Sequence, residues 1–265
     1  MSEAQGRADR AVAGAARPGA ASTGRWRHPA ETGFDAAILR RLTAAAPRAD
    51  EAARPVMAEA NRRRWAAGDH LVVEGQPSPP QFLAAGWACA YRTLGDGRRH
   101  VFGFLMPGDA IGLGLDGGAL SAITALTPAE TVDAAPFLAA AQADPGGRLA
   151  RALEALRADA VARTMDHAVR LGQLSGRERM ADLLLELAGR AVAVGLGDGR
   201  RFPLPVVQET LADALGLSVV HVNRVLRELR LDGLAQIRAG AVVLMRPQAL
   251  GEIARPGSAD PTFGS

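Results

Sequence analysis

The segment 208–230 constrains the fold most, because its residues have the spacing of two short helices joined by a tight turn. Such a turn needs a residue that tolerates a left-handed backbone, and Gly216 supplies it. Ala212 offers a small side chain where the first helix must cross the second closely, and Ser218 can cap the second helix. Apolar residues stand where the two helices must lock together: Leu211, Leu215, Leu217, Val222 and Val225. These independent positions agree, so we predict a helix-turn-helix.

The flanking sequence extends this prediction to a winged helix. Residues 202–206 form a short apolar run before the motif, and residues 235–238 and 241–245 form a hairpin around Ala239 and Gly240. In such a module the second helix enters the major groove of DNA. That helix is predicted to turn these residues outward: Val220, His221, Asn223, Arg224 and Arg227. A module that had lost DNA binding would lack arginine there, whereas this helix keeps Arg224, Arg227 and Arg230.

A long helix is predicted over residues 148–174, with apolar residues on two faces. One face carries a stripe at steps of three and four: Leu149, Leu153, Leu156, Ala160, Thr164, His167 and Leu171. The other carries Ala158, Val161, Met165 and Val169. A helix with two apolar faces must bury both, one against its own domain and one against a second copy. We assign dimerisation to Leu149, Leu153, Leu156, Ala160, His167 and Leu171. The sequence Ser175-Gly176-Arg177-Glu178 is a capping box that starts the next helix.

The N-terminal half has a different pattern of apolar residues and turn signals. Residues 34–60 are helical in pattern but broken at Pro47 and Pro55. Short apolar runs follow at residues 65–73, 81–92 and 99–106, separated by turn signals, and residues 110–137 continue in the same way. We predict a compact antiparallel sandwich or roll over residues 34–147, a helix over 148–174 and a DNA-binding domain over 175–254. Residues 1–33 and 255–265 are predicted to be unstructured tails.

Composition narrows the class of protein. The 265 residues are 48% hydrophobic but only 4% aromatic, so the cores must be aliphatic, and the net charge of +3 means that any DNA-binding signal is local. All 31 basic residues are arginine. The single cysteine, Cys89, excludes an internal disulfide framework and a four-cysteine cluster, and we interpret it as a passive thiol in a reducing, cytoplasmic compartment. We expect no membrane span, no secretory signal, no metal site and, without a nucleophile elbow, phosphate loop or H-E-x-x-H, no enzyme.

Several segments resemble the Crp/Fnr family of transcription regulators. The resemblance covers roughly residues 48–254. Residues 65–69 and 74–75 resemble the opening of the family's β-roll, residues 94–99 its hairpin turn, and residues 103–113 the Fnr/FixK-like branch, while residues 215–224 resemble its DNA-reading signature. The resemblance implies an α+β fold: an N-terminal cyclic-nucleotide-binding-like antiparallel β-roll, a long dimerisation helix and a C-terminal winged helix-turn-helix.

The sequence departs from the family where a ligand would bind. Cyclic-nucleotide binders carry a Gly-Glu pair and a downstream arginine that neutralises the phosphate. Here Gly112 is followed by Leu113, and no Arg or Lys stands between His100 and Arg148. The cysteine cluster of the Fnr oxygen sensor is also missing. Three interpretations stay open: no effector, a neutral or cationic ligand in the roll, or haem, with His70, His100 or Met106 as possible axial ligands. We expect no bound cofactor.

The resemblance also assigns the DNA contacts. The family's arginine that contacts guanine matches Arg224, and Val220 stands where many relatives have glutamate. His221 and Asn223 are further base-reading candidates. Gln208, Ser218 and Arg227 are expected to contact phosphates, and Val207 replaces the family's usual threonine. The predicted function is that of a sequence-specific transcription factor. It would act as a homodimer on a near-palindromic site, with double-stranded DNA and, if it is an activator, RNA polymerase as partners. The alternative is a regulator that senses haem or another ligand.

Overall fold

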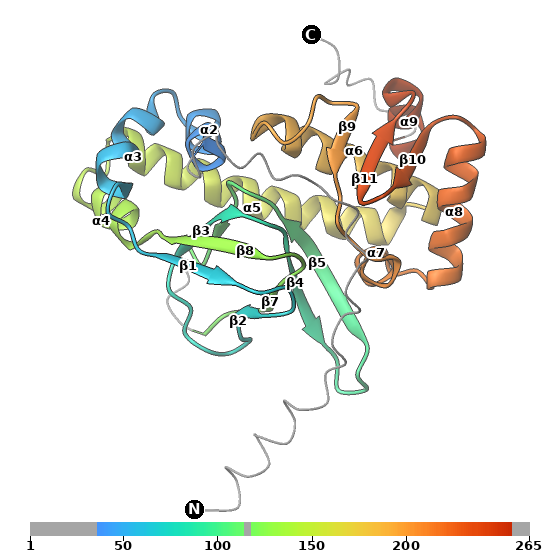
Figure 1. Cartoon of the computed structure of the whole chain (residues 1–265), viewed down its shortest axis with the longest axis horizontal. Coiled ribbons are helices and arrows are strands. Elements are labelled where there is room, and N and C mark those ends of the chain that lie inside the picture. The colour runs from blue at the N-terminus through green and yellow to red at the C-terminus, as the bar shows by residue number, and fades with distance from the viewer. Residues whose placement is uncertain (1–35, 114–117, 256–265) are drawn as a thin grey trace, which may run out of the picture.

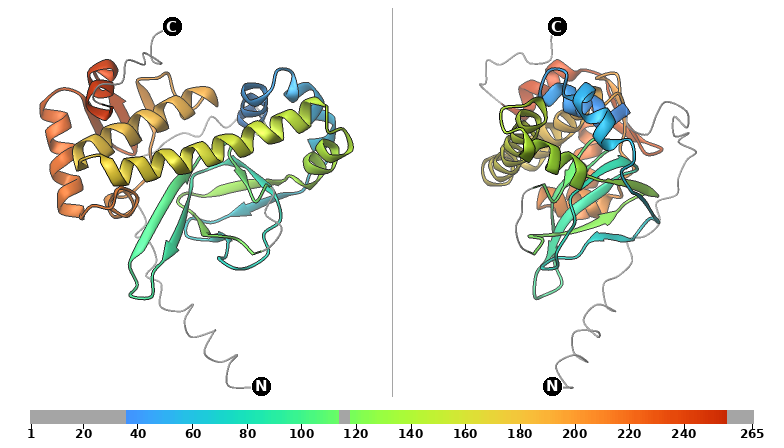
Figure 2. Two further views of the ribbon diagram at one scale, coloured as in Figure 1. Left: turned by 180° about the vertical axis from the view of Figure 1, so that it is seen from behind. Right: turned by 90° about the vertical axis from the view of Figure 1, so that its left-hand side faces the viewer.

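The computed structural model describes residues 36–113 and 118–255, and the two predicted tails lie outside these residues apart from Arg255. The chain builds a β-roll, a long helix that runs the length of the molecule, and a winged-helix domain beside the roll (Figure 1; Figure 2). The predicted α+β architecture is therefore confirmed. Among the described residues, two helices precede the roll, α2 (Ala36–Ala45) and α3 (Ala49–Met57). The break at Pro47 is observed. The break at Pro55 is wrong, because α3 continues through Pro55 and ends two residues later.

The roll consists of two four-stranded antiparallel sheets. One has the order β1-β8-β3-β6 and the other β2-β7-β4-β5. The strands are β1 (Arg62–Trp65), β2 (His70–Val72), β3 (Gln81–Ala85), β4 (Ala88–Thr93), β5 (Arg99–Leu105), β6 (Ala110–Ile111), β7 (Ala122–Ala125) and β8 (Ala129–Asp133). The runs 65–73 and 81–92 are each two strands. Gly86 separates β3 from β4 with a φ of +85°, and a Cβ there would lie 2.4 Å from the carbonyl oxygen of Pro128.

The long helix α5 (Arg148–Gln173) corrects the predicted dimer stripe. Leu149, Leu153 and Leu156 are buried in the chain's own core, packed with α2, α3 and the short helix α4 (Ala135–Ala143). His167 is also buried, and Leu171 is half-buried. Ala160 alone of the six assigned residues is exposed. A residue that the single chain already buries cannot form a seam with a second copy, so the assignment of Leu149, Leu153, Leu156 and His167 to dimerisation is wrong. The assignment of Ala160 and Leu171 stays a prediction.

The other face of α5 is open to solvent over its C-terminal half. Val161, Met165 and Val169 are 54%, 64% and 57% exposed. Ala158, Ala168 and Gly172 are exposed as well. Five of these positions (158, 161, 165, 168 and 172) follow one another at steps of three and four, the spacing of a helix seam. We call them the seam stripe.

The winged-helix domain begins with α6 (Gly176–Ala193). Its capping box is confirmed, since Ser175 accepts from the backbone of Glu178 and the Glu178 side chain accepts from the backbone of Ser175. A three-stranded sheet of order β10-β11-β9 follows, with β9 (Arg201–Pro203), β10 (Ala235–Arg238) and β11 (Ala241–Leu244). Helices α7 (Gln208–Leu215), α8 (Val219–Leu231) and α9 (Pro247–Ala254) complete it.

The roll and the winged-helix domain share one hydrophobic cluster. Cys89, Phe104 and Met106 of the roll belong to the same buried set as Met180 and Leu184 of α6. The β4-β5 side of the β2-β7-β4-β5 sheet is therefore covered by the DNA-binding domain (Figure 1). Among the described residues, no helix has the length and apolar content needed to cross a membrane.

Candidate DNA-binding interface

The helix-turn-helix has the predicted geometry. Gly216 ends α7 with a φ of +61° and donates its N–H to the carbonyl of Ala212. Ser218 caps α8, its hydroxyl oxygen accepting from the backbone N–H of His221 at 3.2 Å. The apolar lock is buried at Leu211, Leu215, Val222 and Val225, and its fifth residue, Leu217, is half-buried; the small Ala212 is buried where the helices cross. The turn and the cap are thus confirmed at each residue that carries the prediction.

Arg179 ties this motif to the turn between α5 and α6. Its Nη1 donates to the carbonyl of Leu215 at 3.0 Å, and its Nε donates to the carbonyl of Leu174 at 2.7 Å. Leu171 of α5 lies close to Gly216 from the same side. The last turn of α7 is therefore held against the end of the long helix. This contact fixes where α8 begins.

The outer face of α8 is polar and basic around one exposed valine. Val220 is 80% exposed, and Asn223, Arg224, Arg227 and Arg230 are exposed as well. The Nε of Arg224 lies 3.9 Å from Oε1 of Glu228, one turn along the helix. This exposed i,i+4 ion pair is weak, so Arg224 can give up its contact with Glu228 for a contact with a base. Helix α8 lies on the outer side of the molecule, where a groove can receive it (Figure 1).

His221 does not lie on this face. A Cβ built on Gly176 would meet Nε2 of His221 at 2.7 Å, so the ring lies against the first residue of α6. His221 is half-buried for the same reason. The placement of His221 on the outward, base-reading face is therefore corrected: its ring packs back onto the domain. The glycine at position 176 makes room for that ring.

Two of the predicted phosphate contacts, Gln208 and Ser218, are exposed at the starts of α7 and α8. Gln208 is the first residue of α7 and is exposed, and Val207 caps the helix without a side-chain hydrogen bond. Ser218 is exposed, although its oxygen is engaged as the cap. Sequence reasoning overlooked Arg238, which is exposed beside the wing turn at Ala239 (φ +51°) and Gly240. A basic residue next to a hairpin turn was the available signal.

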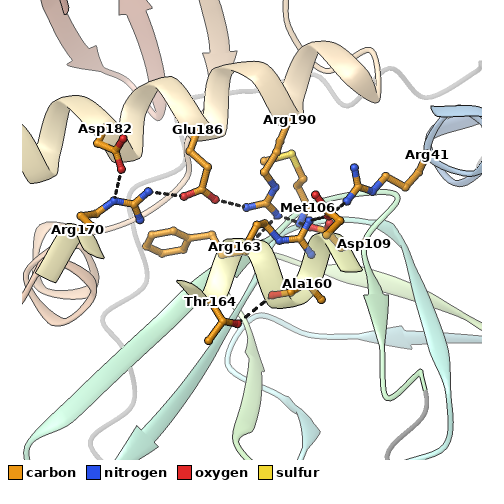
Figure 3. A network of polar contacts seen from close by, with 12 residues as sticks. Arg41, Met106, Asp109, Ala160, Arg163, Thr164, Arg170, Asp182, Glu186 and Arg190 are labelled. Atoms are coloured by element: carbon orange, nitrogen blue, oxygen red, sulfur yellow. Dashed lines mark hydrogen bonds and ion pairs between the residues drawn. The ribbon is translucent and has the colours of Figure 1, made fainter. Parts of the chain in front are cut away.

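Buried charges connect this domain to the rest of the chain (Figure 3). Arg190 of α6 donates to Oδ2 of Asp109 at 2.6 Å, to Oε1 of Glu186 at 2.9 Å and to the carbonyl of Phe104 at 2.8 Å. Arg170 of α5 donates to Glu186 at 2.7 Å and to Asp182 at 2.8 Å. We call Asp109, Arg170, Asp182, Glu186 and Arg190 the anchoring network.

Arginines keep the pKa values of two carboxylates in this network, Asp109 and Glu186, below their ordinary values. Burial raises the pKa of Asp109, but Arg190, Arg163 and the N–H of Met106 outweigh it and leave that pKa below its ordinary value. The pKa of Glu186 is likewise lowered, because Arg190 and Arg170 outweigh the effect of burial. Arg163, Asp159 and Arg41 extend the chain of charges, with Asp159 paired to both arginines. Acids and arginines alternate, so the buried charge is balanced.

A histidine pair lies near this network, where roll and helix meet. Nε2 of His100 on β5 lies 3.0 Å from Nε2 of His167 on α5. Burial lowers the pKa of His167 to about 4 and also lowers that of His100, which favours neutral rings, one donating its N–H to the ring nitrogen of the other. Nδ1 of His70 faces the hydroxyls of both Thr124 and Tyr91, and Met106 is fully buried. His70 and His100, two of the possible haem ligands, thus have partners within the chain, and the third, Met106, is buried in the core.

Two buried acids of the roll are paired with arginines. Asp109 is engaged by Arg190, and Glu130 pairs with Arg62 and Arg64. Burial raises the pKa of the Cys89 thiol to about 11, so this cysteine stays protonated. Among the described residues, no group of three or more His, Cys, Asp or Glu side chains is arranged to hold a metal ion.

Comparison with known proteins agrees with this architecture. Residues 178–253 match the family described as the Crp-like helix-turn-helix domain. The nitrogen fixation regulation protein FixK of Rhizobium meliloti is 32% identical over 169 residues, 63% of this chain and 74% of that protein. FixK of Bradyrhizobium diazoefficiens is 34% identical over 160 residues, 59% of this chain and 66% of that protein.

Comparison with solved structures agrees with the similarity to FixK proteins. The structure of FixK2 from Bradyrhizobium japonicum superposes with a TM-score of 0.67 at 27% identity, covering 75% of this chain and 99% of that one. The shared segment spans the roll, the long helix and the winged helix together. These relatives are transcription regulators, and none is an enzyme. The chain belongs to the Crp/Fnr family of transcription regulators and resembles its FixK members.

Proposed function

We propose that the protein is a homodimeric regulator that binds a near-palindromic DNA site, one half-site for each α8. The observation that carries this proposal is the seam stripe on α5. An apolar stripe that stays exposed along half of a long helix is unfavourable in water unless another surface covers it. Its spacing suits a second copy of the same helix, and a two-fold axis along the seam would present two recognition helices.

Base reading is assigned to Arg224, Val220 and Asn223. Arg224 has the fork of donors that fits the edge of guanine, and it is exposed. Val220 cannot accept from a base amino group but can contact a thymine methyl. Gln208, Ser218 and Arg227 are assigned to phosphates, and Arg238 joins them at the wing. The half-site would keep the family's guanine and differ at the neighbouring base.

We further propose that no cyclic nucleotide is the effector. The missing cassette arginine and the acidic residues of 101–147 support this, since a phosphate would find no cation there. The DNA partner and the single protonated thiol fit a cytoplasmic protein. If the protein activates transcription, RNA polymerase is a further partner.

Light scattering after size exclusion, together with a binding selection on random DNA, tests the proposal. A dimer that selects two inverted half-sites supports it. A monomer at micromolar concentration, or a single unrepeated site, contradicts it. Titration calorimetry with cyclic AMP and cyclic GMP should give no binding heat, and micromolar affinity for either would refute the statement on effectors.

A further inference from the structure

The DNA-binding domain is attached to one strand of the roll at two separate points. At one end of β5, Arg99 donates to Oδ2 of Asp213 on α7 at 2.8 Å. Near the other end, the carbonyl of Phe104 accepts from Arg190 on α6 at 2.8 Å. Two points on one strand resist both sliding and rotation of the domain, whereas one point would resist only sliding.

The second attachment is built from buried charge. The side chain of Arg190 is 13% exposed and that of Asp109 is 6% exposed, and they meet at 2.6 Å. Asp109 also accepts from the N–H of Met106 at 2.8 Å, which fixes the carboxylate within the turn before β6. Any tilt of α6 relative to the roll would separate these groups and leave a charge buried without its partner. That separation is costly, so the network holds one orientation rather than a range.

The orientation of α6 relative to the roll matters because it links helix α5 to the recognition helix α8. Helix α5 carries the seam stripe and packs on β5, whereas α6 leads into α7 and α8. Figure 3 shows Arg170 and Arg163 on α5 turned toward Glu186 and Arg190 on α6, with Asp109 of the roll beside them. The anchoring network therefore fixes α8 relative to the seam. In a two-fold dimer, this fixes the distance and the rotation between the two recognition helices.

We propose that Asp109 and Arg190, supported by the Arg99–Asp213 pair, determine the half-site spacing that the dimer accepts. The inference rests on the proposed dimeric DNA binding and adds a specificity that base contacts do not supply. Half-site spacing follows from the geometry of a dimer. One added base pair moves a half-site by about 3.4 Å along the helix axis and also rotates it. A rigidly anchored pair of helices cannot follow this shift, but a loosely attached pair can.

The test compares binding of the full chain to three DNA duplexes with the selected half-sites at the preferred spacing, one base pair shorter and one base pair longer. Fluorescence anisotropy at fixed salt gives the three dissociation constants. For the unaltered protein, we expect an off-spacing penalty of about tenfold or more, since a displaced half-site loses at least as much as one mismatched base pair. For Asp109→Asn, the penalty should fall to about threefold or less on the same scale.

Two further variants keep the test decisive if Asp109→Asn folds poorly. Arg99→Gln breaks the attachment at the more exposed pair, where the side chains are 24% and 29% exposed, and should lower the penalty by a smaller factor. Asp109→Asn combined with Arg190→Gln removes both charges, so stability recovers without the anchor, and the penalty should stay low. Glu154→Gln is the matched control, because it breaks an exposed ion pair with Arg157 on α5 that contacts no part of the DNA-binding domain. Its spacing penalty should equal that of the unaltered protein.

The outcomes separate this inference from the proposed function. If the variants remain dimers and bind all three duplexes more weakly by one common factor, the network is merely structural and the inference is overturned. Recovery of the full penalty in the double variant would overturn it as well. A protein that is monomeric, or that prefers no paired half-sites, would instead contradict the proposed function, and the spacing inference with it.

Discussion

Helices α5 and α8 each bury one face and expose the other, but the exposed faces differ in chemistry. The open face of α5 carries Val161, Met165 and Val169, whereas the open face of α8 carries Asn223, Arg224 and Arg227. An apolar face is stabilised by another apolar surface, and a face of arginines is stabilised by phosphates and base edges. Under the proposed function, exposure therefore points to different partners for the two helices: a second copy of the chain for α5 and DNA for α8.

The largest effect is expected when an arginine, the residue type that marks the open face of α8, is placed on the apolar open face of α5. Met165→Arg puts a cation into the apolar stripe twice per dimer, and like charges facing each other across an interface cost several kcal/mol. We expect a folded monomer with an unchanged circular dichroism spectrum and a large loss of affinity for paired half-sites. Light scattering after size exclusion measures the mass. A Met165→Arg protein that is still a dimer at micromolar concentration would show that the seam lies elsewhere.

The buried face of α5 should respond in the opposite way. Leu156 packs among Ile38, Leu42 and Phe137 of its own chain. Leu156→Ala leaves a cavity there and should lower the free energy of unfolding by about 2–5 kcal/mol. The dimer should persist at temperatures where the variant remains folded. Urea unfolding gives the stability and light scattering gives the mass. If the variant were monomeric but as stable as the unaltered chain, the leucine face would be the seam after all.

The sequence could predict features that depend on contacts between residues close together in the chain. Gly216, Ser218 and the capping box at residues 175–178 act within a few residues of themselves, and the structure confirms each. The two apolar faces of α5 were also visible, because periodicity reports faces. Periodicity shows which residues share a face of a helix, but it does not show what packs against that face. For that reason it could not show that the leucines pack within their own chain.

The remaining features depend on residues that are distant in the sequence. Asp109 and Arg190 are 81 positions apart, and nothing local at either site predicts their ion pair. The ring of His221 turns toward Gly176 because the start of α6 lies behind α8, which only the packing of the domain determines. Non-local contacts of this kind position the DNA-binding site relative to helix α5. Local signals identified the motif but could not orient it.

A smaller effect is expected on the open face of α8. Arg224→Ala removes the donor fork that fits guanine and should cost roughly 1–3 kcal/mol per half-site while relaxing the preference at one base pair. Stability should not change, because the side chain is 66% exposed. A binding selection on randomised half-sites at fixed salt measures both quantities. If the base profile of Arg224→Ala matches that of the unaltered protein, Arg224 is not the guanine reader.

The smallest effect should come from the same face one turn further along. Arg227 is exposed on α8, and we expect it to contact a phosphate rather than a base. Arg227→Ala should weaken binding about equally for every sequence and leave the base profile unaltered. Each lost phosphate contact lowers the slope of log affinity against log salt by about 1, so the dimer should lose about 2. Anisotropy titrations over a salt series give this slope, and Arg224→Ala is the matched control with altered base preference. A selective loss at one base pair would show that Arg227 reads sequence, and the basic face of α8 would then hold two reading arginines instead of one.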